Sequence, residues 1–185
     1  MILVREATPE DVAQLHQMIN ELVEYEKAPE EVVATEQNLM KALFGRDLLS
    51  PEFDQHDSIA GAGTAETPSG HPAVYALVIE DSENPDDLAG MAIWFLNYST
   101  WDGKHGIYLE DLYVRPKFRG QGMGKALLKR MAQICLENNY TRFQWWVLDW
   151  NESAIEVYRA MGAKAMDEWT VYRVSGQELT ELASE

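Results

Sequence analysis

The chain has 185 residues, of which 46% are hydrophobic, so it is long enough for one well-packed domain and short for two. It carries 31 acidic and 15 basic residues, and its net charge of −16 would repel a nucleic-acid backbone or an anionic membrane surface. We therefore expect a single domain over residues 1–185, with neither nucleic acid nor a membrane as a partner.

The composition also bears on location. No apolar run approaches the roughly 18 residues that a membrane helix needs, and charges follow the N-terminus at once, unlike a signal peptide. The single cysteine, Cys135, cannot form an intramolecular disulfide, which suits a reducing compartment. These features predict a soluble cytoplasmic protein.

The first predicted elements are a short strand near residues 2–4 and a helix. Thr8 provides the N-cap of this helix and Pro9 its first turn, and an apolar stripe follows as far as Val23.

A second helix is predicted to begin at Thr35 and to end at Gly45. Residues 50–72 have little periodicity and many turn-forming residues, so we expect a long flexible loop there.

The rest of the chain alternates strand-like and helix-like patterns. Because its middle reads as an antiparallel meander between helical segments, we expect a mixed sheet with helices on both faces. The predicted elements are strands at 74–80, 88–96, 106–114, 143–148 and 169–174, a helix following the glycines at 120–124, a helix capped by Asn151 that ends at Gly162, and a short final helix.

Three glycines alternate in RGQGMG, residues 119–124, where a strand passes into a helix. Glycine permits backbone dihedrals closed to other residues, and the amide groups at a helix start attract anions. The loop lacks the GK[ST] ending of a P-loop and the GxGxxG spacing of a dinucleotide fold. On the hexapeptide alone, a phosphate site and a simple strand ending are about equally favoured.

The longer stretch LEDLYVRPKFRGQGMGKALL resembles the acetyl-CoA motif of the GNAT N-acetyltransferases, whose Arg/Gln-x-x-Gly-x-Gly/Ala pattern is met by Arg119, Gly122 and Gly124. The resemblance implies an α/β GNAT fold with a mixed, mostly antiparallel sheet, helices on both faces and a splayed parallel strand pair at the acetyl-CoA site. The cofactor-binding residues that it implies are Leu112, Tyr113, Val114, Arg119, Gly120, Gln121, Gly122, Met123, Gly124, Lys125 and Asn151.

Further segments, including ELVEYE at 21–26 and WNESAIEVYRAMGA at 150–163, resemble the spermidine/spermine and thialysine acetyltransferase branch. The resemblance implies a small cationic amine as substrate and a homodimer as the assembly. Its substrate-binding residues would be Tyr25, Glu26, Trp101, Glu110 and Asp111. For Glu26, the polar end of an amphipathic helix is an equally good explanation.

Acetyl transfer to an amine requires a base, because alkylamines have pKa values of about 10 and are protonated near neutrality. Glu110 is the predicted base, although adjacent residues of a strand face opposite sides, so Asp111 would share its pocket only if a bulge intervenes. Tyr158 matches the family's proton donor to the leaving thiolate. Without the resemblance, an ordinary core position for Tyr158 would be favoured.

The expected function is therefore acetyl transfer from acetyl-CoA to a primary amine of a polyamine-like substrate. Thialysine, another lysine-like amino acid, an aminoglycoside or a protein amine are alternative acceptors, and a CoA-binding regulatory module is the non-enzymatic alternative. No metal is expected, because the histidines lack ligand spacing; they are His16, His56, His71 and His105. Cys135 is expected in the core.

Overall fold

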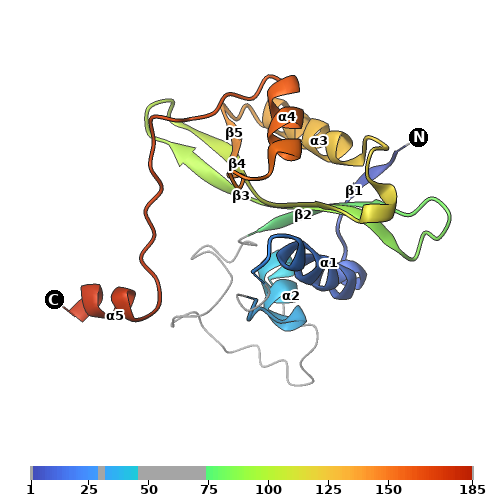
Figure 1. Cartoon of the computed structure of the whole chain (residues 1–185), viewed down its shortest axis with the longest axis horizontal. Coiled ribbons are helices and arrows are strands. Elements are labelled where there is room, and N and C mark those ends of the chain that lie inside the picture. The colour runs from blue at the N-terminus through green and yellow to red at the C-terminus, as the bar shows by residue number, and fades with distance from the viewer. Residues whose placement is uncertain (1, 29–31, 46–73, 185) are drawn as a thin grey trace. The chain divides into compact units, whose positions relative to one another are not determined.

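A computed structural model describes residues 2–28, 32–45 and 74–184 (Figure 1). The chain forms two compact units, Met1–Trp146 and Val147–Glu185, which we call the N-terminal and C-terminal units and describe in turn. The predicted loop at 50–72 lies outside the described residues, and the expectation of one domain stays a prediction.

The N-terminal unit is built on a five-stranded sheet in the order β1-β2-β3-β4-β5. All neighbouring strands are antiparallel except β4 and β5, which are parallel, so the predicted mixed sheet is confirmed. The strands are β1 (Val4–Glu6), β2 (Tyr75–Glu80), β3 (Leu88–Ser99), β4 (Lys104–Val114) and β5 (Phe143–Trp145). The sequence pattern at 143–148 overestimated β5, which ends at Trp145.

Helices cover both faces of this sheet, with α1 and α2 on one side and α3 on the other (Figure 1). The second helix has the predicted caps: Thr35 accepts a hydrogen bond from the Asn38 amide, and Gly45 adopts a left-handed conformation with φ of 65°. The helical elements are η1 (Pro9–Asp11), α1 (Val12–Tyr25), α2 (Glu36–Phe44), η3 (Pro116–Phe118) and α3 (Met123–Glu137).

Two apolar layers hold the sheet between these helices. One layer joins the buried faces of α1 and α2 to alternate residues of β2 and β3, among them Leu15, Met18 and Met91. Leu127 and Met131 of α3 are fully buried on the other face. Full burial of each such side chain stabilises the fold by about 1.5–3 kcal/mol. Cys135 is buried in α3, as predicted.

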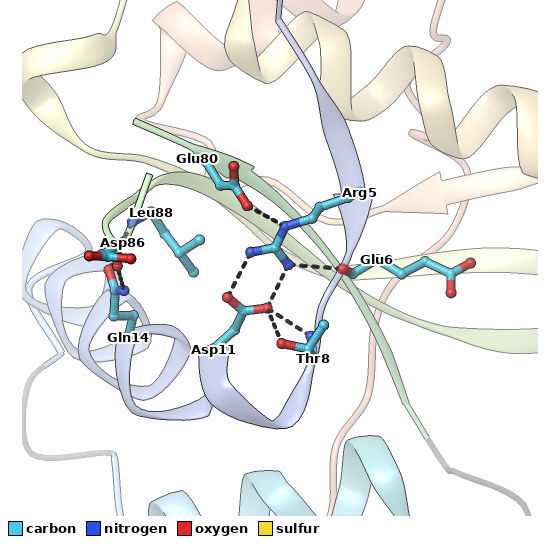
Figure 2. A network of polar contacts seen from close by, with 8 residues as sticks. All are labelled: Arg5, Glu6, Thr8, Asp11, Gln14, Glu80, Asp86 and Leu88. Atoms are coloured by element: carbon cyan, nitrogen blue, oxygen red, sulfur yellow. Dashed lines mark hydrogen bonds and ion pairs between the residues drawn. The ribbon is translucent and has the colours of Figure 1, made fainter. Parts of the chain in front are cut away.

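Arg5 ties the first strand to its neighbours (Figure 2). Its guanidinium donates to Glu80 at 2.6 Å and to the two carboxylate oxygens of Asp11 at 2.7 and 3.0 Å. Asp11 is buried, and although burial opposes its ionisation, the hydrogen bonds from Arg5 hold its pKa below the usual range. Thr8 caps η1 rather than α1 directly, so one 3₁₀ turn precedes the predicted helix.

The C-terminal unit contains the helices α4 (Glu152–Ala160) and α5 (Gly176–Ser184). Asn151 accepts a hydrogen bond from the Ala154 amide at 3.4 Å, so its predicted capping role is confirmed. The predicted strand at 169–174 is wrong: residues 147–184 contain no strand. A strand needs a neighbour for its backbone hydrogen bonds, and this unit offers none.

The aromatic side chains of that segment are consequently exposed, Trp169 by 66% and Tyr172 by 91%. Within the described ranges, no helix is both long and apolar enough to cross a bilayer.

Candidate active site

A β-bulge lies in β4, where the ladder to β3 shifts by one residue. Asp111 is opposite Ile93 and Leu109 is opposite Trp94, which leaves Glu110 without a partner on β3. Residues opposite one another on paired strands face the same side, so Asp111 lies with Ile93 on the α1 face of the sheet. The bulge interrupts the alternation between strand neighbours, which is the condition under which Glu110 can lie beside Asp111.

Three carboxylates interact around this bulge. Burial, and to a smaller extent the negative charges of Glu110 and Glu26, together raise the pKa of Asp111 to about 7. Burial also raises the pKa of Glu26, which follows the last residue of α1. We call Glu26, Glu110 and Asp111 the carboxylate cluster. Because it concentrates negative charge in a partly buried place, it suits a cationic ligand that neutralises it.

Two of the three glycines in the loop have the backbone geometry that the sequence predicted, whereas the third, Gly124, lies within the helix α3 (Met123–Glu137). Gly120 and Gly122 have φ values of 75° and 85°, and Gly122 is the N-cap of α3. Among the described residues, no side chain caps this helix, and its first turn has no acidic residue. A β-carbon added to Gly120 would meet nothing within 4 Å. The open space beside Gly120 and the uncapped start of α3 together fit a phosphate group.

Beyond this loop, β4 and β5 separate. Their parallel ladder covers only three pairs and ends where Leu109 is opposite Trp145, whereas β4 continues to Val114. Residues 110–114 therefore have no ladder partner on β5. This is the splayed strand pair that the family resemblance implies, and a strand edge without a ladder partner suits an extended ligand.

Arg119, at the entrance of the loop, also contacts the end of α1. Its Nε donates to the Val114 carbonyl at 2.9 Å. The guanidinium carbon lies 4.9 Å from the ring centre of Tyr25 and 5.6 Å from that of Tyr113. Sequence reasoning missed this contact, since 94 residues separate Tyr25 from Arg119 and no local pattern connects them.

The remaining predicted site residues are Trp101, Asn151 and Tyr158. Trp101 is 89% exposed in the turn between β3 and β4, and at 3.4 Å per residue the start of β4 is roughly 20 Å along the strand from Glu110. Asn151 and Tyr158 belong to the C-terminal unit, where Tyr158 is half-buried on α4. The roles of these three residues stay predictions.

The parts of the chain that the structure describes contain no group of three or more His, Cys, Asp or Glu side chains arranged to hold a metal. His16 and His105 instead contact backbone carbonyls, and His56 and His71 lie outside the described residues.

The acetyltransferase (GNAT) family profile matches residues 37–163, which include the sheet from β2 to β5, the glycine loop and α4. The chain belongs to the GNAT acetyltransferase family. It is an amine N-acetyltransferase, in keeping with N-acetyltransferases that resemble it over nearly its whole length.

One such relative is a thialysine N-epsilon-acetyltransferase of Sus scrofa, 33% identical over 190 residues that cover 98% of this chain and 97% of the relative. Another is the L-ornithine N5-acetyltransferase NATA1 of Arabidopsis thaliana, 34% identical over 197 residues, with 95% and 85% covered. Among solved structures, an integron cassette protein from the mobile metagenome of V. cholerae has a TM-score of 0.71 at 23% identity, with 100% of this chain and 98% of that chain covered. This last likeness shows the fold alone.

Proposed function

We propose that this GNAT enzyme transfers acetyl from acetyl-CoA to the terminal primary amine of a lysine-like amino acid. The observation that carries the proposal is the carboxylate cluster at the bulge of β4, which suits a cationic acceptor. The sequence resemblance favours a polyamine and leaves lysine-like amino acids as an alternative. The thialysine and ornithine acetyltransferases among the relatives favour that alternative.

The glycine loop and the free edge of β4 fit acetyl-CoA, which would supply the acetyl group as a reactive thioester. The loop amides from Gly120 to Lys125 would bind its phosphates at the start of α3. The backbone of Leu112, Tyr113 and Val114 would bind the extended pantetheine arm, since β5 does not pair with this part of β4.

In this proposal, the carboxylate cluster binds the acceptor and removes a proton from it. A terminal alkylamine has a pKa of about 10.4 and arrives protonated, so it is attracted to Asp111 and Glu26. Glu110, the residue at the bulge, accepts the proton and leaves the amine nitrogen free to attack. Tyr158 keeps the role that the family resemblance implies, as the group that protonates the leaving thiolate.

A polyamine is the second candidate acceptor, and the charge of the site favours it. A polyamine carries only positive groups, whereas a lysine-like amino acid also brings a carboxylate that the cluster would repel. The net charge of −16 also favours a polyamine, because it attracts polycations from a distance.

We further propose that the enzyme acts as a homodimer in the cytoplasm. The segment at 169–174 supports the dimer, because it has a β-type sequence, no strand partner in its own unit and exposed aromatic side chains. Light scattering coupled to size-exclusion chromatography would give twice the 21.0 kDa mass of one chain, and a monomeric mass would refute the dimer.

The acceptor is tested by mass spectrometry of the products formed from acetyl-CoA and separate samples of thialysine, ornithine, lysine, spermidine and spermine. Fragmentation locates the acetyl group. The proposal predicts acetylation of the amino acids at the nitrogen farthest from the carboxylate, and acetylation of the polyamines alone would establish the second candidate instead.

A further inference from the structure

We propose that Arg119 is a positioning residue that links the glycine loop to the carboxylate cluster through the ring of Tyr25. The inference rests on the proposed function, because it assigns the loop to acetyl-CoA and the cluster to the amine. The binding of acetyl-CoA and the binding of the amine would then be coupled. Arg119, at the entrance of the phosphate site, also holds the end of α1, and this end carries Glu26 of the amine site.

A short series of contacts connects the glycine loop to the carboxylate cluster. Arg119 directly precedes Gly120, and its guanidinium lies over the Tyr25 ring at 4.9 Å. Tyr25 is the last residue of α1 and is followed by Glu26, a member of the carboxylate cluster. A displacement of the Arg119 side chain would therefore be transmitted to Glu26 through one ring and one peptide bond.

Arg119 is held in this position from the strand side as well. Its Nε is occupied by the Val114 carbonyl at 2.9 Å, and the ring of Tyr113, which is only 5% exposed, lies 5.6 Å from the guanidinium carbon. An arginine offers five N–H donors in a planar fork, so the bond through Nε leaves four that can contact a phosphate while the flat face stays on Tyr25.

A second arginine fixes the same end of α1 one turn earlier. Arg115 Nε donates to the Glu21 carboxylate at 3.3 Å, and its NH1 donates to the Leu88 carbonyl at 3.0 Å. Glu21 also accepts a hydrogen bond from Tyr113, whose pKa is raised by burial and by that carboxylate. The helix backbone thus stays anchored when the contact between Arg119 and Tyr25 is removed, so the loss of that contact changes the position of the helix end without unfolding α1.

The expected size of the coupling follows from the type of contact. Cation–π contacts at partly exposed sites are worth about 0.5–1 kcal/mol, and Tyr25 is 38% exposed. This corresponds to an affinity change of about two- to fivefold. Removal of the Tyr25 ring takes away this contact of Arg119 and is therefore expected to weaken the binding of acetyl-CoA, which Tyr25 itself does not touch in this account.

The first experiment is calorimetric titration of acetyl-CoA into the wild type, Tyr25→Leu and Tyr25→Phe. Tyr25→Leu is expected to bind about two- to fivefold more weakly, and Tyr25→Phe within twofold of the wild type because it keeps the ring. Glu24→Ala, which changes an exposed neighbour on α1, is the matched control and should bind like the wild type. Equal binding by Tyr25→Leu and the wild type, or equal losses in both tyrosine variants, would overturn the inference.

A double-mutant cycle with Arg119→Met separates coupling from a general loss of structure. Once the guanidinium is gone, Tyr25→Leu should have no further effect on acetyl-CoA affinity, whereas additive effects would overturn the link. If Tyr25→Leu does not fold, the KM for the amine is measured in Arg119→Met at saturating acetyl-CoA. A two- to fivefold rise supports the inference, and an unchanged KM overturns it.

Failure of the proposed function gives a different result from failure of this inference. If the wild type binds no acetyl-CoA, the assignment of the loop is wrong and both proposals fall. If the wild type binds acetyl-CoA and only the coupling is missing, the proposed function stands and the positioning role of Arg119 is rejected.

Discussion

Glu110 follows Leu109 without a partner on β3, while Asp111, the next residue, is again paired, to Ile93. In a regular strand, the side chains of Glu110 and Asp111 would point to opposite faces of the sheet. The bulge interrupts this alternation.

Replacing the base should affect turnover more than binding. Glu110→Gln keeps the size of the side chain and removes its ability to accept a proton, so kcat should fall by about 10²–10⁴-fold. The Kd for acetyl-CoA, measured by calorimetry, should stay within twofold of the wild type. A variant with normal kcat would show that Glu110 is not the base.

The cluster also makes folding stability depend on pH. The pKa of Asp111 is about 7 in the folded protein and 3.8 for a free aspartate, so between these values the folded state holds a proton that the unfolded state has lost. Stability from this group is present at low pH and is lost as the pH rises from about 4 to 7. Asp111→Asn removes this loss, because an amide does not ionise.

Thermal or urea unfolding at several pH values tests whether Asp111 lowers the folding stability as the pH rises. Asp111→Asn and the wild type should differ little at pH 4, and at pH 8 the variant should be more stable by about 2–4 kcal/mol, since one pKa unit corresponds to about 1.4 kcal/mol. A variant that is less stable than the wild type at pH 8 would contradict burial of the Asp111 carboxyl.

The glycine loop should not tolerate a branched side chain. Gly122 has φ of 85°, where a valine is strained and its side chain projects among the amides at the start of α3, so Gly122→Val should lose acetyl-CoA binding in calorimetry. Gly103→Val is the matched control, because Gly103 has φ of 64° in the β3–β4 turn, outside the loop. A folded Gly122→Val that binds acetyl-CoA normally would refute the assignment of the loop.

The proposed role of Tyr158 as a proton donor can be tested by kinetics alone. Tyr158→Phe removes only the hydroxyl, and loss of a positioned acid should lower kcat by about 10²–10⁴-fold with little change in acetyl-CoA affinity. Tyr98→Phe, at a side chain that is 53% exposed and lies outside both the site and the segment at 169–174, is the control and should have normal kinetics. Unchanged turnover in Tyr158→Phe would remove Tyr158 from the mechanism.

Local signals predicted most of the fold. The N-cap at Thr35 and the left-handed Gly45 delimit α2, and the glycines at 120 and 122 have the positive φ values that their pattern required. These features depend on neighbours within one turn of the chain, so a single sequence contains the information. The family resemblance supplied the splayed strand pair.

The sequence failed where a partner lies far away along the chain. Residues 169–174 have the composition of a strand, but strand formation requires a second strand, and composition does not say whether one is available. The sequence shows only that Glu110 and Asp111 need a bulge in order to share a pocket. Whether the bulge forms depends on how β3 and β4 align. The contact between Tyr25 and Arg119 joins α1 to the loop across 94 residues of sequence, so no local pattern indicates it.

The central claim, acetyl transfer from acetyl-CoA to a terminal primary amine, is tested most directly by release of free thiol. Purified wild type and Glu110→Gln would be mixed with acetyl-CoA and, in separate reactions, thialysine, ornithine, lysine, spermidine and spermine. The account predicts rapid CoA release by the wild type with thialysine or ornithine and a large loss of rate in the variant. Tight binding of acetyl-CoA without thiol release for any of the five amines would contradict it.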